Sequence, residues 1–154
     1  MRRPWRSRGY SLVELVIVAL LLSILAMVAL PTGRHLVKRN KEAELRGALR
    51  ELRFAIDEFK RYSDAGMIEL ELGTDGYPSE LEQLYEGVDL LGQIGRQAKF
   101  LRRLPLDPMT GEVEWGRRSY HDDFDSTSWG GENIFDVYSL SEGVGLNGVP
   151  YSQW

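Results

Sequence analysis

Residues 10–31 read YSLVELVIVALLLSILAMVALP, an apolar run in which Glu14 is the only charged side chain. A helix rises about 1.5 Å per residue, so about 20 apolar residues cross about 30 Å of hydrocarbon. The run therefore predicts a membrane-spanning helix. A secretory signal peptide and a plain single-pass anchor share this outline, although a signal peptide usually has an apolar core of only about 7 to 15 residues. The A-x-A cleavage pattern is missing, since Ala26 and Ala29 stand three positions apart.

Glu14 is the feature that a plain anchor leaves unexplained. A carboxylate at the bilayer centre costs about 2.5 to 3.5 kcal/mol on insertion scales, so it needs a partner. A cut between Gly9 and Tyr10 would create an α-amino group four residues away on the same helical face, or on a neighbouring chain. The simpler alternative is a glutamate that snorkels to the nearby interface.

Composition limits the other classes of function. The chain has 154 residues, which leaves room for one domain and an appendage. It has no Cys, which excludes a disulfide scaffold, a thiolate zinc site and a cysteine nucleophile. Four of the 19 Lys and Arg residues lie within residues 1–9, which leaves 15 against 23 Asp and Glu. A chain that is this acidic beyond its first nine residues is a poor candidate for nucleic-acid binding.

The string Arg8-Gly9-Tyr10-Ser11-Leu12-Val13-Glu14, followed by the apolar run and Pro31, resembles the class III signal of type IV pilins and type II secretion pseudopilins. The resemblance implies that prepilin peptidase cuts after Gly9 on the cytoplasmic side and that Tyr10 is then N-methylated. This family usually has Phe at that position. Glu14 matches the assembly carboxylate, and Pro31 matches a proline that interrupts the N-terminal helix in many members.

The rest of the chain resembles the major pseudopilin of type II secretion systems. The segments that carry this likeness are GYPSELEQL at 76–84, FLRRLPLDPMTGE at 100–112 and DVYSLSEG at 136–143. Many type IV pilins have a C-terminal disulfide, so the lack of Cys favours the pseudopilin branch. The resemblance implies a leader at 1–9, a transmembrane and filament-core helix at 10–31, and a periplasmic helix with a globular domain at 32–154.

Its implied function is that of a non-enzymatic subunit of a periplasmic filament that helps to drive protein export. The implied partners are further copies joined through their N-terminal helices, prepilin peptidase, the inner-membrane assembly platform, minor pseudopilins and the lipid bilayer. A type IV pilus subunit or a minor pseudopilin is the alternative within the superfamily. Outside it stands an unprocessed, membrane-tethered monomeric binding domain, which would keep Met1 as its first residue.

A second helical segment follows Pro31. Apolar residues recur at spacings of four, three, four and three, which predicts an amphipathic helix that ends between Ser63 and Gly66. Such a stripe needs a cover, either a folded domain of the same chain or a coiled-coil partner. Together with the span it predicts one rod of residues 10–62, bent at Pro31. The stripe is Leu45, Leu49, Leu52, Ile56 and Phe59, and the pairs Glu42–Arg46 and Asp57–Arg61 have the favourable i,i+4 order.

The remaining residues predict a small antiparallel sheet with loop-rich connections. Residues 67–78 predict either a short strand, because apolar and acidic side chains alternate at 68–72, or an ordered loop. The loop is favoured, since residues 73–78 are dense in turn formers. Ser79 with Glu82 forms a capping box for a short helix to about Tyr85. A turn at 107–111 precedes strands expected at 113–115 and 133–140, separated by a polar loop at 121–132. The predicted fold is α+β and pilin-like: a long N-terminal helix packed on this sheet.

The two histidines, His35 and His121, lie in no catalytic motif, so no enzymatic activity is expected. Calcium prefers six to eight oxygen ligands. The major pseudopilin family binds calcium after its last strand, where Glu142 is the one acid that carries over and Asn147 is a further oxygen donor. The acidic loop at 121–132 offers a second candidate site, with a solvated loop as the simpler alternative. Its oxygen donors are Asp122, Asp123 and Asp125.

Charge is distributed unevenly along the chain. Residues 32–62 hold nine basic and five acidic side chains, whereas residues 112–154 hold two basic and eight acidic ones. A contact between the basic helix of one copy and the acidic loops of another would extend as a filament if the rotation does not close. Reversing the charge of Arg46 and Arg50 tests this hypothesis; the alternative is that the two faces meet within one subunit.

Overall fold

The computed structural model describes residues 9–69, 71–93 and 95–154, and within these ranges the side chains of residues 28–34 are left out. It forms two compact units, one up to Lys38 and one from Arg39 to Trp154. The predicted bend at Pro31 lies outside the described side chains. Of the leader predicted at 1–9, only Gly9 belongs to the described residues.

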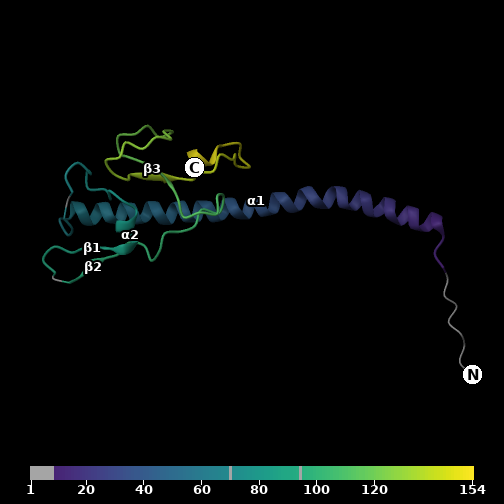
Figure 1. Cartoon of the computed structure of the whole chain (residues 1–154), viewed down its shortest axis with the longest axis horizontal. Helices are drawn as coiled ribbons and strands as arrows, with labels where there is room; N and C mark the ends of the chain where they lie inside the picture. Colours follow the sequence, from purple (N-terminus) through teal and green to yellow (C-terminus); the bar gives the residue numbers. More distant parts are fainter. Residues whose placement is uncertain (1–8, 70, 94) are drawn as a thin grey trace, which may run out of the picture. The chain divides into compact units, whose positions relative to one another are not determined.

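Helix α1 (Leu12–Asp64) begins two residues after the predicted start and ends within the predicted interval (Figure 1). Its end is a Schellman motif: Gly66 N donates to Ser63 O at 2.9 Å, and Met67 N donates to Tyr62 O at 3.0 Å. Gly66 has a φ of 65°, a conformation that glycine adopts without a Cβ clash. Residues beyond it turn back to cover the helix.

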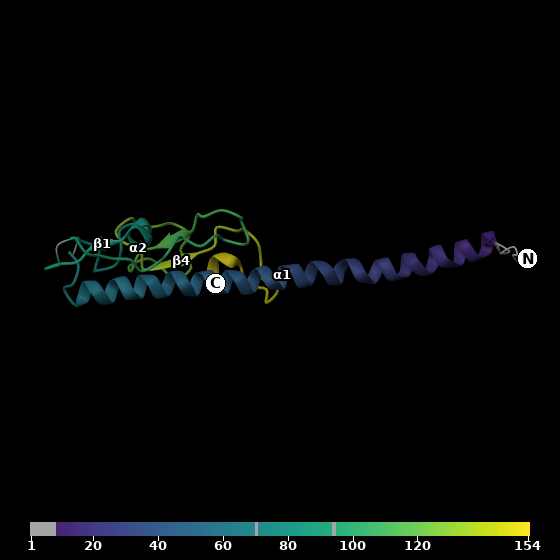
Figure 2. The same cartoon turned by 90° about the horizontal axis from the view of Figure 1, so that it is seen from below.

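The apolar stripe of α1 forms the core of the second unit. Leu45, Leu52 and Ile56 are fully buried, and Leu49 and Phe59 are nearly so. In this unit the other segments lie along one side of α1 (Figure 2), and they supply Leu84, Ile134 and Val137 to the same cluster. The stripe is covered by its own chain, so it offers no seam for the coiled-coil alternative.

The sheet predicted as one unit consists of two antiparallel pairs. Strand β1 (Val88–Asp89) pairs with β2 (Gln97–Ala98), a hairpin that the sequence did not predict. Strand β3 (Gly116–Arg118) pairs with β4 (Asp136–Tyr138). The α+β fold is thereby confirmed, and β4 lies inside the predicted range.

Strand β3 begins three residues later than the position 113–115 predicted for it. The prediction used the alternation of Val113 and Trp115, but Trp115 is fixed by its indole, which donates to Pro105 O at 3.0 Å. Gly116 lies opposite Tyr138, and a Cβ at this glycine would come within 2.3 Å of the tyrosine ring. The pairing of β3 with β4 therefore starts at Gly116, where the absence of a side chain leaves room for the Tyr138 ring.

Helix α2 (Glu82–Glu86) is present, but the predicted capping box is wrong. No side chain caps its first turn from the N-cap position. Instead, Gln83 Oε1 accepts a hydrogen bond from Ser79 N at 2.9 Å. A short 3-10 helix, η1 (Tyr151–Gln153), lies near the C-terminus. The predicted loop at 67–78 is confirmed over its described residues, with one β-bridge between Ile68 and Leu90.

The ion pairs predicted along the helix, Glu42–Arg46 and Asp57–Arg61, give way to other contacts. Arg61 pairs with Glu58 rather than with Asp57. Glu42 is 4% exposed and turns into the core instead of toward Arg46. Position 42 lies three residues before Leu45 and seven before Leu49, which places it on the buried stripe.

Candidate processing and assembly site

The predicted cleavage point lies in irregular, accessible backbone. Gly9 and Tyr10 precede α1, and the side chain of Tyr10 is 77% exposed. Apart from its chain neighbours, no heavy atom of the described residues lies within 4 Å of the position that a Cβ on Gly9 would take. Hydrogen bonding of the helix starts with Leu15 N to Ser11 O at 3.1 Å, so Tyr10 stands outside the first turn in the uncleaved chain. A peptidase would meet an open peptide bond here.

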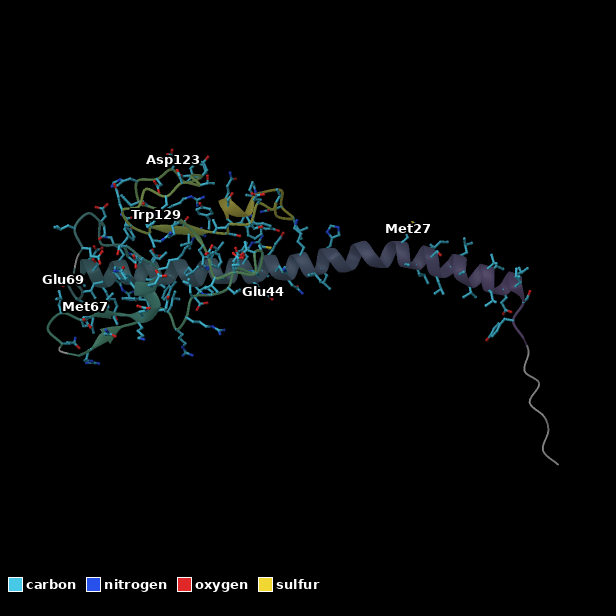
Figure 3. All side chains as sticks on the ribbon, viewed as in Figure 1. Met27, Glu44, Met67, Glu69, Asp123 and Trp129 are labelled. Carbon is cyan, nitrogen blue, oxygen red and sulfur yellow. The ribbon has the colours of Figure 1, made fainter. Side chains whose placement is uncertain are left out.

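Glu14 lies in the first turn of α1 and is exposed. Around it, the apolar side chains of residues 12–27 are exposed as well, for example Leu15 at 57% and Leu22 at 60%. Figure 3 shows side chains projecting from this part of α1 into open space, with Met27 labelled. Apolar surface of this extent marks a contact with lipid or protein.

For the residues that the structure describes, no helix meets both the length and the apolar character required to cross a bilayer.

In the second unit, Glu42 holds the C-terminal segment on α1. Its carboxylate accepts hydrogen bonds from Tyr151 Oη at 3.0 Å and from Leu146 N at 2.8 Å. Burial, together with the hydrogen bond to Glu42, raises the pKa of Tyr151 to about 12. The neutral phenol is therefore the form that the fold selects.

Two arginines of α1 complete this attachment. Arg53 Nε donates to Asp136 Oδ1 at 2.6 Å, and its Nη2 donates to Trp154 O at 2.7 Å. The Arg46 guanidinium lies 4.3 Å from the centre of the Trp154 ring, a cation–π distance. Sequence reasoning missed these contacts because they join residues about a hundred positions apart.

Hydrogen bonds join the three segments 76–84, 100–112 and 136–143. Leu84 O accepts from Phe100 N at 2.9 Å and from Leu101 N at 2.8 Å. Ser139 Oγ donates to Asp107 Oδ2 at 2.6 Å, and both residues are fully buried. Asp107 was predicted only as a turn former, a role it also has, since its Oδ1 accepts from Met109 N at 2.8 Å. It thus ties the turn to the segment after β4.

One carboxylate of the acidic loop at 121–132 accepts hydrogen bonds from nearby backbone N–H groups. Asp122 Oδ2 accepts from Ser119 N at 2.7 Å and from Gly130 N at 3.1 Å. These backbone donors hold the pKa of Asp122 below its usual range. Asp123, at the outer edge of the loop in Figure 3, and Asp125 are exposed. Asp122 therefore acts as a cap for its own loop.

The other calcium candidates are dispersed. Glu142 is exposed, and Asn147 Oδ1 accepts from Val149 N at 3.1 Å, which closes a turn. Across the described part of the chain, no three or more Asp, Glu, His or Cys side chains are grouped so that they could hold a metal ion. Calcium binding stays a prediction from the resemblance.

The two histidines belong to different units of the chain. His35 is an exposed residue of α1. His121 Nε2 lies 3.4 Å from Asp75 Oδ2 at the surface.

Comparison with known proteins agrees with the processing signal. The family described as "Prokaryotic N-terminal methylation motif" matches residues 6–30. Neither the curated proteins nor the solved structures give a match. The N-terminal segment is prepilin-like: it carries the motif typical of type IV pilin-like proteins, which prepilin peptidase processes. Such proteins are in general structural rather than enzymatic, and the motif suggests a precursor anchored in the inner membrane.

Proposed function

We propose that this chain is a structural subunit of a type II secretion pseudopilus. Prepilin peptidase cuts it after Gly9, and the mature chain polymerises through its N-terminal helix into a periplasmic filament. The observation that carries the proposal is the register of the methylation motif, with Gly9 in open backbone, Glu14 in the first helical turn and exposed apolar side chains behind it.

The assignment to the pseudopilin branch rests on two further features. The three segments that resemble the major pseudopilin form one bonded layer, through Leu84 with Phe100 and Asp107 with Ser139. The chain also has no Cys, whereas many type IV pilins close their C-terminal region with a disulfide. A type IV pilus subunit and a minor pseudopilin are the alternatives within the same superfamily.

The mature N-terminus tests the proposal. The full chain is expressed in cells with active prepilin peptidase, extracted from membranes and measured by intact mass and N-terminal sequencing. The proposal expects Tyr10 as the first residue, with one added methyl group. Met1 as the first residue would favour the unprocessed, tethered monomer.

Glu14 gives the second test. The chain with Glu14→Ala is expected to insert in the membrane as before and to lose sedimentable filaments, because the carboxylate no longer meets the terminal amine of a neighbouring copy. Glu44→Ala is the matched control, since Glu44 is an exposed glutamate of the same helix in the second unit. Normal filaments from Glu14→Ala would contradict the proposed role.

A further inference from the structure

The outer face of α1 in the second unit carries a large apolar side chain without cover. Phe54 is 65% exposed, whereas Phe59 of the same helix is 6% exposed. Phe54 lies two residues from both Leu52 and Ile56, which corresponds to about 200° around the helix. It therefore points away from the core that these two residues enter. Arg50, one turn earlier, is exposed and has no carboxylate partner among the described residues.

A groove of about 410 Å³ opens elsewhere on the same unit. Seven of its eleven lining residues are apolar or aromatic, although its open surface is more polar than apolar. The described lining residues lie in or beside α2, β3 and β4 and in the loops between them, and none belongs to α1. It therefore opens on a side of the unit other than the outer face of α1. Its apolar lining includes Leu81, Leu104, Val113, Trp115, Trp129 and Leu140.

The charges at the groove complement the charge beside Phe54. Glu82 and Glu114 stand in the groove lining, and in the described part of the chain neither forms an ion pair. The one cation of the lining, Arg117, is already placed 4.0 Å from the centre of the Trp129 ring. Two carboxylates without an ion-pair partner among the described residues thus face solvent at this groove, and an arginine without one stands beside an exposed phenylalanine.

We propose that Phe54 of one copy fills this groove on a second copy, with Arg50 beside its Glu82 and Glu114. Since the phenylalanine and the groove lie on different faces, one molecule cannot satisfy both by itself. A contact of this heterologous kind leaves a free groove at one end and a free phenylalanine at the other, and so extends as an open chain. The inference rests on the proposed function, because it names the lateral contact between filament subunits.

The absence of Cys from the chain allows a direct crosslinking test. Glu51→Cys and Val113→Cys are combined in the full chain, which keeps Phe54 in place. Processed, sedimented material is treated with a short bismaleimide. The inference expects a ladder of covalent oligomers, because each copy then bears one thiol at each side of the contact. The matched control combines Glu51→Cys with Phe124→Cys, where Phe124 is 84% exposed but outside the groove.

Substitutions of the contact itself give a second readout. Phe54→Ser is expected to lower the sedimented fraction roughly tenfold, as for a central contact residue, and Phe124→Ser to leave it unchanged. Arg50→Glu and Glu114→Arg each lower it, and the double exchange restores it. These positions are exposed, so the fold is retained.

The outcomes separate the two proposals. Sediment from the parent chain without a ladder from the Glu51→Cys, Val113→Cys variant overturns this contact and leaves the proposed function standing. A ladder of equal length from the control pair overturns it as well. If the processed parent chain gives no sediment at all, the proposed function fails, and this contact between filament subunits fails with it.

Discussion

The two parts of helix α1 bury similar side chains to opposite extents. In the first unit Leu15 and Leu22 are 57% and 60% exposed, whereas in the second unit Leu45 and Leu52 are fully buried. The first part carries an exposed glutamate, Glu14, and the second part carries a buried one, Glu42. An apolar helix is thus not by itself a core element. The second part is covered by its own chain, whereas the apolar side chains of the first part are exposed.

The largest expected effect comes from shortening one leucine in each part. Leu52→Ala should lower the free energy of unfolding of the second unit by about 2 to 5 kcal/mol, because it leaves a cavity in a packed core. Leu22→Ala should change it by less than about 0.5 kcal/mol, since that side chain contributes nothing to this core. Urea unfolding of the detergent-solubilised full chain, followed by tryptophan fluorescence, measures both. Equal losses would remove the contrast between the two parts.

Glu14 and Glu42 should affect assembly and stability separately. Glu42→Ala leaves Tyr151 Oη and Leu146 N without their acceptor, which should cost about 1 to 3 kcal/mol of unfolding free energy. Glu14→Ala should leave that free energy unchanged while filaments are lost. The same urea titration, combined with sedimentation, separates stability from assembly. A stable Glu42→Ala chain would show that the C-terminal segment is held mainly by its apolar contacts.

A smaller effect should appear only at high pH. The folded pKa of Tyr151 is about 12, against 10.0 for the free side chain. Its contribution to stability is therefore fully present below pH 10 and is lost as the pH rises through 12, since the unfolded chain releases this proton first. Tyr151→Phe should flatten the pH dependence of unfolding in this window, although the pKa of Tyr77 is also raised by burial. An unchanged slope would exclude Tyr151 as its source.

Local periodicity was sufficient to predict the buried face of helix α1. The spacing of Leu45, Leu49, Leu52, Ile56 and Phe59 predicted the buried face, and Gly66 marked the helix end. Glu42 was misassigned because a charged residue was placed by its neighbour Arg46 rather than by its position on the stripe. An extension of the stripe by one turn would have placed it inward.

Contacts between residues far apart in the chain could not be predicted from the sequence. The strands have only two or three residues each, too few for alternation to fix their ends, so β3 was placed three residues early. The pairing of Asp107 with Ser139 joins positions that no local pattern connects. The processing and assembly residues could be predicted because their signal depends only on spacing within one short segment. These residues are Gly9, Tyr10 and Glu14.

If the proposed function is correct, other copies of the chain cover the exposed apolar surface of residues 12–27. A photoreactive amino acid at position 22 tests this most directly, in cells with active prepilin peptidase and with Tyr10 verified as the first residue. The expected product is an adduct of twice the mass of the processed chain, with little of it from Glu14→Ala. Sedimentable protein whose residue 22 reacts with lipid alone would contradict it.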